Sequence, residues 1–192
     1  MKNIALFGGT FDPIHNGHLK VAEVVLSTSN FDEFWFVPSA VPPHKDDNMF
    51  TFEERIQMIR LATDNNNRIQ IWDRDFRKNS KSFTILLIQD LKLRFINYNF
   101  SFIIGADNVL KLKTWKAYKE LIELVDFIVV NRKTIDVNLW SSLDYYSKLS
   151  FINMPEYDIS SSELRDMIRL KKDLSSFIPK RVVEFINKKR RS

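Results

Sequence analysis

The sequence predicts an α/β fold: a Rossmann-like, doubly wound parallel sheet with helices on both faces and a helical cap at the C-terminus. Short, continuously apolar runs alternate with helical patterns along most of the chain. Such runs are typical of parallel strands that are covered on both faces and joined by right-handed crossovers. From Ile159 onwards the pattern is helical without strands, and this stretch is the expected cap.

The expected elements follow one another in a regular order. Short apolar runs predict strands at residues 4–7, 34–37, 68–72, 102–104 and 127–130. Apolar residues at helical spacing predict helices over 18–27, 51–62 and 83–95. Thr51 and Glu54 have the spacing of a capping box at the start of the second helix. Because no linker interrupts the pattern, residues 1–192 are expected to form one domain that includes the cap at 159–192.

Composition excludes several classes of protein. No window approaches the roughly 20 apolar residues of a membrane span, and the apolar run at the N-terminus is too short for a signal peptide. The absence of cysteine excludes disulfides, thiolate metal sites and a cysteine nucleophile, and it is compatible with a reducing cytoplasm. We therefore expect a cytoplasmic protein without a membrane partner. The net charge of +5 suits phosphate-bearing partners, but the lysines are too dispersed for us to expect nucleic acid.

The sequence GGTFDPIHNGHL, residues 8–19, directly follows the first expected strand. Gly8 and Gly9 are expected to let the backbone turn tightly and approach a ligand closely. The pair Asp12-Pro13 is typical of a turn. In doubly wound sheets, ligands bind beyond the carboxyl ends of the strands. This stretch is therefore a candidate binding segment.

Two of the three histidines of the chain, His15 and His18, fall at the start of the first expected helix. Free backbone N–H groups and the helix dipole favour an anion at that position. Two imidazoles three residues apart can face the same phosphate chain and donate to oxygens that gain charge in a transition state. Turn histidines that merely cap a helix are the structural alternative.

A second candidate motif, ISSSELR, occupies residues 159–165. Ser160 and Glu163 have capping-box spacing, which places Ser161 in the first turn of a helix and Arg165 one turn further on. Hydroxyl groups, free amides and a guanidinium at one helix start can hold a phosphate. Taken alone, the motif is also compatible with an ordinary capped helix.

Together the two motifs resemble the signatures of the HxGH nucleotidyltransferase superfamily, whose members transfer a nucleoside monophosphate from a nucleoside triphosphate. A Walker loop and a G-x-G-x-x-G fingerprint are both absent from the sequence. Within the superfamily, the chain resembles the bacterial nicotinate-nucleotide adenylyltransferases. The segments that carry this resemblance are VPSAVPPHK at 37–45, FIIGADNVLKLKTW at 102–115, FIVVNR at 127–132 and the closing SSFIPKRVVEFI.

This resemblance implies a set of site residues. The implied catalytic residues are His15, His18, Lys45 and Arg165. The implied ATP site comprises Gly8, Gly9, Thr10, Phe11, His15, His18, Gly105, Asp107, Ile159, Ser160, Ser161 and Arg165. The implied site for nicotinate mononucleotide comprises His44, Lys45, Thr84, Trp115 and Arg132. Mg²⁺ would arrive with ATP, and the resemblance implies no protein ligand for a metal.

One segment departs from the family pattern. Ser82, Phe83 and Thr84 stand where the family has serine, an aromatic residue (usually tyrosine) and threonine, but Leu86 occupies an aspartate position. Thr84 lies near the expected place of the nicotinate carboxylate, so the departure affects the substrate assignment. The sequence leaves the choice between nicotinate and nicotinamide mononucleotide open. It also leaves the oligomeric state open, and a homo-oligomer is possible.

Other functions remain as alternatives. Phosphopantetheine adenylyltransferase has similar signatures, although its chains are shorter and the PPHK and GAD…W segments are not expected in it. A non-catalytic, basic nucleic-acid-binding module would need a clustered Lys/Arg face with interleaved aromatic residues. An inactive nucleotide sensor would bind ATP without releasing pyrophosphate.

Overall fold

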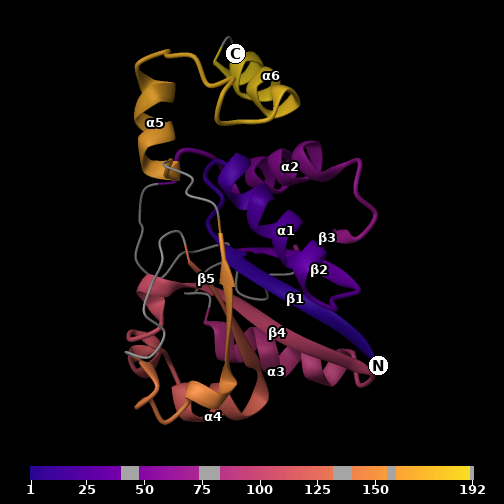
Figure 1. The fold of residues 1–192 in the computed structure, drawn as a ribbon. Helices are drawn as coiled ribbons and strands as arrows, with labels where there is room; N and C mark the ends of the chain where they lie inside the picture. Colours follow the sequence, from indigo (N-terminus) through magenta and orange to yellow (C-terminus); the bar gives the residue numbers. More distant parts are fainter. Residues whose placement is uncertain (40–47, 74–82, 132–139, 155–158, 191–192) are drawn as a thin grey trace.

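A computed structural model describes residues 1–39, 48–73, 83–131, 140–154 and 159–190. These residues contain a six-stranded parallel sheet in the order β3-β2-β1-β4-β5-β6. The strand order reverses between β1 and β4, as it does in doubly wound folds. The α/β class and the Rossmann-like parallel sheet that the sequence predicts are therefore confirmed (Figure 1).

The strands and helices lie close to their predicted positions. The strands are β1 Lys2–Gly9, β2 Glu33–Pro38, β3 Ile69–Ile71, β4 Tyr98–Gly105, β5 Asp126–Asn131 and β6 Leu149–Asn153. The helices are α1 Asn16–Thr28, α2 Phe52–Thr63, α3 Thr84–Arg94, α4 Tyr118–Leu124, α5 Ser161–Arg169 and α6 Lys180–Lys189. The edge strand β6 and the short helix α4 have no counterpart among the predicted elements. Both are short, and β6 interrupts its apolar run with Ser150, which hides the pattern of a buried strand.

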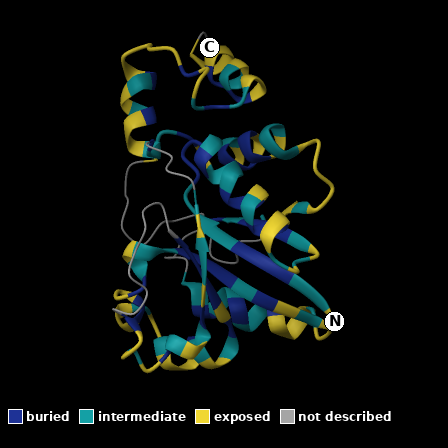
Figure 2. Ribbon diagram, in the orientation of Figure 1, coloured by how far each residue is buried: buried dark blue, intermediate teal, exposed yellow. Residues whose placement is uncertain are grey.

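Alternate residues of the strands enter two separate hydrophobic cores. One core joins one face of the sheet to α1, α2, α5 and α6, and its strand residues include Ala5 and Phe34. The other joins the opposite face to α3 and α4, and it takes the strand neighbours Leu6 and Trp35. This alternation is the period of two expected of a pleated strand with both faces covered. Figures 1 and 2 show these layers and the buried central strands.

The two glycines at the end of β1 do not make the turn that the sequence suggested. Both remain in the extended strand, and the residue with a positive φ (51°) is Phe11. A Cβ atom on Gly8 would approach the ring of Phe102 to 2.7 Å, and one on Gly9 would approach the ring of Phe11 to 2.8 Å. In this structure the rings of Phe102 and Phe11 occupy the space that a Cβ atom would take at Gly8 and Gly9.

The C-terminal cap is attached to α1 and α2 by polar contacts. The backbone N–H of Asn16, the first residue of α1, donates to the carbonyl of Phe177 at 2.8 Å. On α6, Lys189 contacts Glu54 of α2 at 2.5 Å. A hydrogen bond from Lys189 lowers the pKa of Glu54 below 4.5. The cap therefore lies beside the start of α1, where the first motif is found.

We predict that this ion pair makes the stability of the protein depend on pH. A carboxyl whose pKa is lowered by folding stabilises the folded state above its unfolded pKa of 4.5, and loses this effect as the pH falls through the folded value. At about pH 7, Glu54→Gln should lower the free energy of unfolding by about 0.5–1 kcal/mol. The difference should shrink as the pH falls through the lowered pKa of Glu54, as measured by urea unfolding over a series of acidic pH values.

Lys189→Met should lose most of the same pH-dependent part of the stability, because it removes the partner with the largest effect on the pKa of Glu54 and leaves only the hydrogen bonds from Thr51. A difference between wild type and Glu54→Gln that does not shrink anywhere between neutral pH and the acid limit of the folded state would contradict the assignment.

Candidate active site

The first motif lies at the point where the strand order reverses. At the carboxyl end of β1, Gly9 pairs with Pro38 of β2, and on the other side of the strand Phe7 pairs with Ile103 of β4. Gly105 ends β4 at the same edge of the sheet. Residues that follow β1, β2 and β4 therefore meet at one edge, which is where ligands of doubly wound sheets bind.

His15 and His18 form a stacked pair at the start of α1. Their ring centroids are 3.7 Å apart with an interplanar angle of 29°. The backbone N–H of His15 donates to Nδ1 of His18 at 3.3 Å. Because Nδ1 accepts this hydrogen bond, the proton of the neutral His18 ring is on Nε2. Nε2 of the neutral ring is therefore a hydrogen-bond donor.

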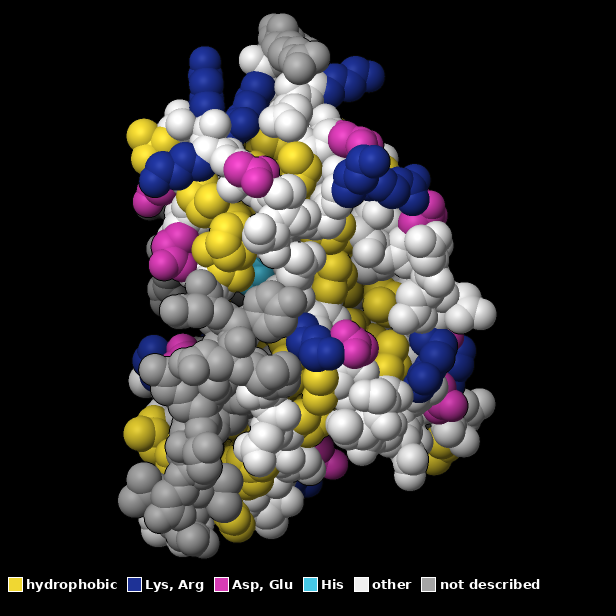
Figure 3. All heavy atoms as spheres, turned by 45° about the horizontal axis from the view of Figure 1, so that its top comes forward, with side chains coloured by type: hydrophobic (Ala, Val, Ile, Leu, Met, Phe, Trp, Pro, Cys, Tyr) yellow, Lys and Arg dark blue, Asp and Glu magenta, His cyan; other side chains and the backbone are white. Residues whose placement is uncertain are grey.

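Burial separates the two histidines. His15 is only 1% exposed, whereas His18 is half-buried. A histidine side chain reaches the molecular surface in Figure 3. The buried ring of Phe11 supports His18 from the inside, with centroids 5.0 Å apart and the rings nearly perpendicular. His18 is therefore the more accessible member of the pair, with His15 stacked against it.

The start of α5 lies against the segment that leads into α1. Nη1 of Arg165 donates to the carbonyl of Asp12 at 3.0 Å, and the hydroxyl of Ser161 donates to the carbonyl of Pro13 at 3.2 Å. The structure thus brings together the two helix starts that the sequence predicted to hold one phosphate chain, although 148 residues separate Pro13 from Ser161.

The first turn of α5 is organised by the predicted capping box. The hydroxyl of Ser160 accepts from the backbone N–H of Glu163 at 3.2 Å, and the Glu163 carboxylate accepts from Ser160 N–H at 2.7 Å. Hydrogen bonds from Ser160 also hold the pKa of Glu163 below its usual value. One turn on, Nη2 of Arg165 donates to the hydroxyl of Ser162 at 2.9 Å. The guanidinium is therefore fixed before any ligand binds.

Three buried polar or charged side chains occur in the described part of the chain: Asp12, His15 and Arg55. All three surround the segment between β1 and α1. Asp12 accepts hydrogen bonds from the backbone N–H groups of Met49 and Phe50, at 2.8 and 3.0 Å. The sequence pattern indicates only a turn at Asp12 and does not single out Arg55. Arg55 lies on the buried face of α2, next to Ile56 and one turn before Ile59, and a cation on an apolar helix face is the pattern that could have revealed it.

The residues implied for the rest of the two substrates lie beyond β4 and at the start of α3. Asp107 is in a single 3₁₀ turn after Gly105, with a side chain that is 72% exposed. Trp115 is half-buried and packs edge-on against Phe102, 6.1 Å between ring centroids. The next residue, Lys116, places its ammonium 4.6 Å from the ring centre of Phe83. This contact brings the Trp115 segment beside the start of α3, which is Thr84.

Other predicted residues are placed differently or not described. The side chains of Phe11 and Ile159 are buried in the core that contains α1, so only their backbone atoms can meet a ligand. His44, Lys45 and Arg132 lie outside the described residues.

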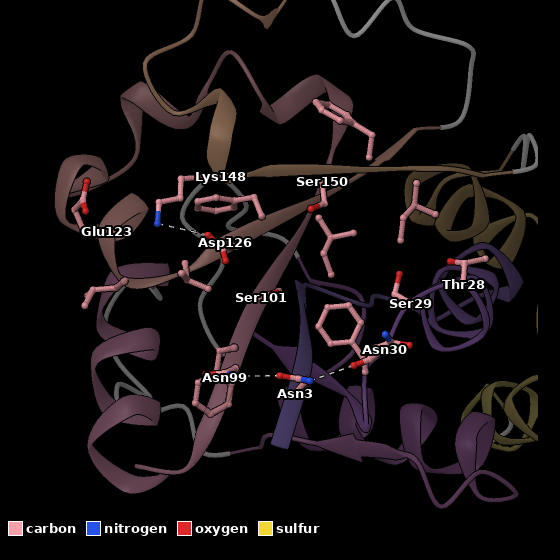
Figure 4. A pocket seen from close by; sticks show the side chains of 18 of the residues that line it. Asn3, Thr28, Ser29, Asn30, Asn99, Ser101, Glu123, Asp126, Lys148 and Ser150 are labelled. Carbon is pink, nitrogen blue, oxygen red and sulfur yellow. Dashed lines mark hydrogen bonds and ion pairs between the residues drawn. The ribbon is translucent and has the colours of Figure 1, made fainter. Parts of the chain in front are cut away.

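A hollow of about 910 Å³ lies at the opposite edge of the sheet (Figure 4). Its lining includes Asn3, Ser101 and Asp126, from the amino ends of β1, β4 and β5. None of the predicted site residues lines it.

Over the described ranges, no helix has the length and apolar character needed to cross a membrane.

Comparison with known proteins identifies the family. Residues 6–167 match the cytidylyltransferase-like family. The nicotinate-nucleotide adenylyltransferase of Bacillus subtilis is 36% identical over 187 residues, which cover 97% of this chain and 96% of that protein. A probable nicotinate-nucleotide adenylyltransferase of Bacillus licheniformis is 34% identical over 99% of this chain and 98% of that protein. The chain belongs to the nicotinate-nucleotide adenylyltransferase family.

A solved structure supports the same assignment. The Plasmodium falciparum nicotinic acid mononucleotide adenylyltransferase complexed with NaAD superposes with a TM-score of 0.81 at 26% identity. The match covers 98% of this chain and 96% of that chain, so the whole described fold is that of a family member. The predicted membership, made on the two motifs and on the segments between them, is confirmed.

We predict that Asp12→Asn destabilises the protein by about 2–3 kcal/mol in urea unfolding. An amide has one oxygen to accept from Met49 and Phe50, and its NH₂ group would face a buried backbone donor. The exposed Asp126→Asn, which removes an ion pair 3.6 Å long, is the matched control and should change the free energy of unfolding by less than about 0.5 kcal/mol. Equal stability of the two variants would show that the buried carboxylate does not hold this segment.

Proposed function

We propose that this adenylyltransferase joins ATP and nicotinate mononucleotide to give deamido-NAD and pyrophosphate, a step in the biosynthesis of NAD. The observation that carries the proposal is the contact between the two helix starts. In this contact Arg165 and Ser161 donate to the carbonyls of Asp12 and Pro13, in the segment that leads into the stacked His15–His18 pair. Membership in the family named for this reaction supports the choice of substrates.

In this proposal the ATP phosphates lie between the starts of α1 and α5. Nε2 of His18 donates to a phosphate oxygen, and Arg165 and the first turn of α5 hold the part of the triphosphate that leaves as pyrophosphate. The backbone of Gly8, Gly9, Thr10 and Phe11 faces the nucleotide from the end of β1. Gly105 lines the adenine side, and the exposed carboxylate of Asp107 accepts hydrogen bonds from ribose hydroxyls.

Nicotinate mononucleotide is proposed to bind between β4 and α3. The electron-poor pyridinium ring stacks on the indole of Trp115, while Thr84 and nearby amides meet the carboxylate. The contact between Lys116 and Phe83 supports this arrangement, because it holds the two segments together. His44, Lys45 and Arg132 complete the proposed substrate contacts by resemblance to the family.

The reaction needs no covalent enzyme intermediate. A phosphate oxygen of the mononucleotide attacks the α-phosphorus of ATP in line, the new P–O bond forms, and the bond to the β-phosphate oxygen breaks with pyrophosphate as the leaving group. The attacking phosphate is already ionised, so no general base is required. Catalysis then consists of positioning the two reacting phosphates and neutralising the charge on the oxygens of the transferring phosphoryl group in the transition state.

Mg²⁺ is proposed to enter with ATP. Across the described residues, no group of three or more His, Asp or Glu side chains is placed to hold a metal ion. Phosphate oxygens and water are sufficient ligands for Mg²⁺. The proposal therefore includes no protein ligand for Mg²⁺. Since the substrate is ATP, we place the reaction in the cytoplasm.

The function is tested by incubating the purified protein with ATP, Mg²⁺ and one acceptor at a time, and measuring pyrophosphate. Nicotinate mononucleotide should give deamido-NAD at the highest kcat/KM. The kcat/KM for nicotinamide mononucleotide, compared with that for nicotinate mononucleotide, gives the preference between the two acceptors. The departure from the family pattern at Phe83 and Leu86 leaves this preference open. Turnover of phosphopantetheine in place of both mononucleotides would identify the other adenylyltransferase, and ATP binding without pyrophosphate release would identify a nucleotide sensor.

We predict that His18→Ala lowers kcat by about 10²–10³-fold, equivalent to about 2.7–4 kcal/mol of transition-state stabilisation, with little change in folding stability. Because the donor is Nε2, His18→Gln should retain more activity than His18→Asn, whose amide nitrogen corresponds in position to Nδ1. Glu23→Ala, on the same helix with a side chain 66% exposed, is the matched control and should keep wild-type turnover. Full activity of His18→Ala would refute the role of this imidazole.

A further inference from the structure

Arg55 is the largest side chain that is almost completely buried, with an exposure of 1%. It projects from the first turn of α2 toward the ends of two strands. Its Nη1 donates to the carbonyl of Thr10 at 2.6 Å and to the carbonyl of Ser39 at 2.9 Å. One nitrogen of a single guanidinium therefore links the backbone just after β1 to the backbone just after β2.

The two carbonyls belong to segments that carry different parts of the proposed site. Thr10 opens the stretch that ends in the histidine pair, and Ser39 directly precedes the stretch that contains His44 and Lys45 in the sequence. The backbone N–H of Ser39 also donates to the carbonyl of Gly9 at 3.0 Å. Arg55 thus strengthens a junction that the backbone already makes.

A second set of hydrogen bonds connects this segment to residues further along the chain. Asp12 holds the backbone N–H groups of Met49 and Phe50, which immediately precede α2. Ser39 and Met49 are therefore both attached to residues 9–12. Arg55 is the side chain that serves the first of these attachments, and Asp12 serves the second.

The chemistry of arginine suits this position better than that of other donors. Its guanidinium keeps its charge when buried, and its N–H groups have fixed directions. A neutral side chain without N–H groups would leave two partly buried carbonyls without this donor, a defect that lets the strand ends move. The charge also lies directly behind the segment proposed to face the triphosphate, where a low dielectric strengthens its attraction for phosphate.

We propose that Arg55 is a positioning residue for the adenylyl transfer: it fixes the starting points of the two phosphate-facing segments without touching substrate. This inference rests on the proposed function. Since a displacement of about 1 Å in a reacting group can cost 10²-fold in rate, loss of the guanidinium should act on kcat more strongly than on the stability of the fold.

The test compares variants at position 55 with a matched control on the same helix. Arg55→Met should lower kcat by about 10²-fold, whereas Arg55→Lys, which retains the charge and a donor, should lose only about tenfold. Arg60→Met removes an exposed guanidinium that pairs with Asp73 at 2.9 Å, and should stay within about twofold of wild type. Rates are expressed per folded molecule, with folding measured by circular dichroism and urea unfolding.

A rescue experiment separates positioning from mere structural support. Arg55→Ala leaves a space for the missing group, so millimolar methylguanidinium should restore its kcat in a saturable way and should leave Arg60→Met unchanged. Folded Arg55→Met with wild-type kcat would overturn the proposal, and so would activity of Arg55→Ala that methylguanidinium does not raise. If Arg55→Met fails to fold, wild-type kcat in Arg55→Lys overturns it. Wild-type protein that is inactive with ATP and nicotinate mononucleotide would instead reject the proposed function.

Discussion

Three carbonyl groups in the segment between β1 and α1, those of Thr10, Asp12 and Pro13, each accept a hydrogen bond from a side chain of a distant helix. The donors are Arg55 of α2, and Arg165 and Ser161 of α5. This segment forms neither a strand nor a helix, so its path depends on these bonds. The position of the histidine pair at its end, and of the start of α5 beside it, follows from the same constraint.

Burying the charge of Asp12 in this segment costs desolvation free energy, which its hydrogen bonds and a nearby guanidinium offset. The Asp12 carboxylate accepts from two backbone N–H groups and lies 3.9 Å from a guanidinium nitrogen of Arg165. Buried charges that are paired and hydrogen-bonded hold one geometry strongly, because breaking either partner leaves the other unsatisfied. A site that binds a flexible, highly charged triphosphate gains from such rigidity, since less ordering is needed when the ligand arrives.

Sequence patterns predicted the central features because they depend on local rules. The buried strands show as apolar runs, and the caps at Thr51 and Ser160 follow from spacing alone. Contacts between segments far apart in the chain could not be predicted from the sequence in the same way. The sequence predicts a turn at Gly8 and Gly9 because glycine is common in turns. In the structure both glycines lie in the strand, and the rings of Phe102 and Phe11 occupy the space of a Cβ atom there. Asp12 and Arg55 act on backbone atoms that lie far along the chain, and a single sequence contains no measure of that proximity.

The central claim is that both helix starts hold one triphosphate. Amide chemical shifts recorded while a non-hydrolysable ATP analogue is added test it most directly. The account predicts that the amides of His15–His18 and those of Ser161–Arg165 shift together and saturate at one dissociation constant. Shifts confined to one helix start, or two different dissociation constants, would contradict it.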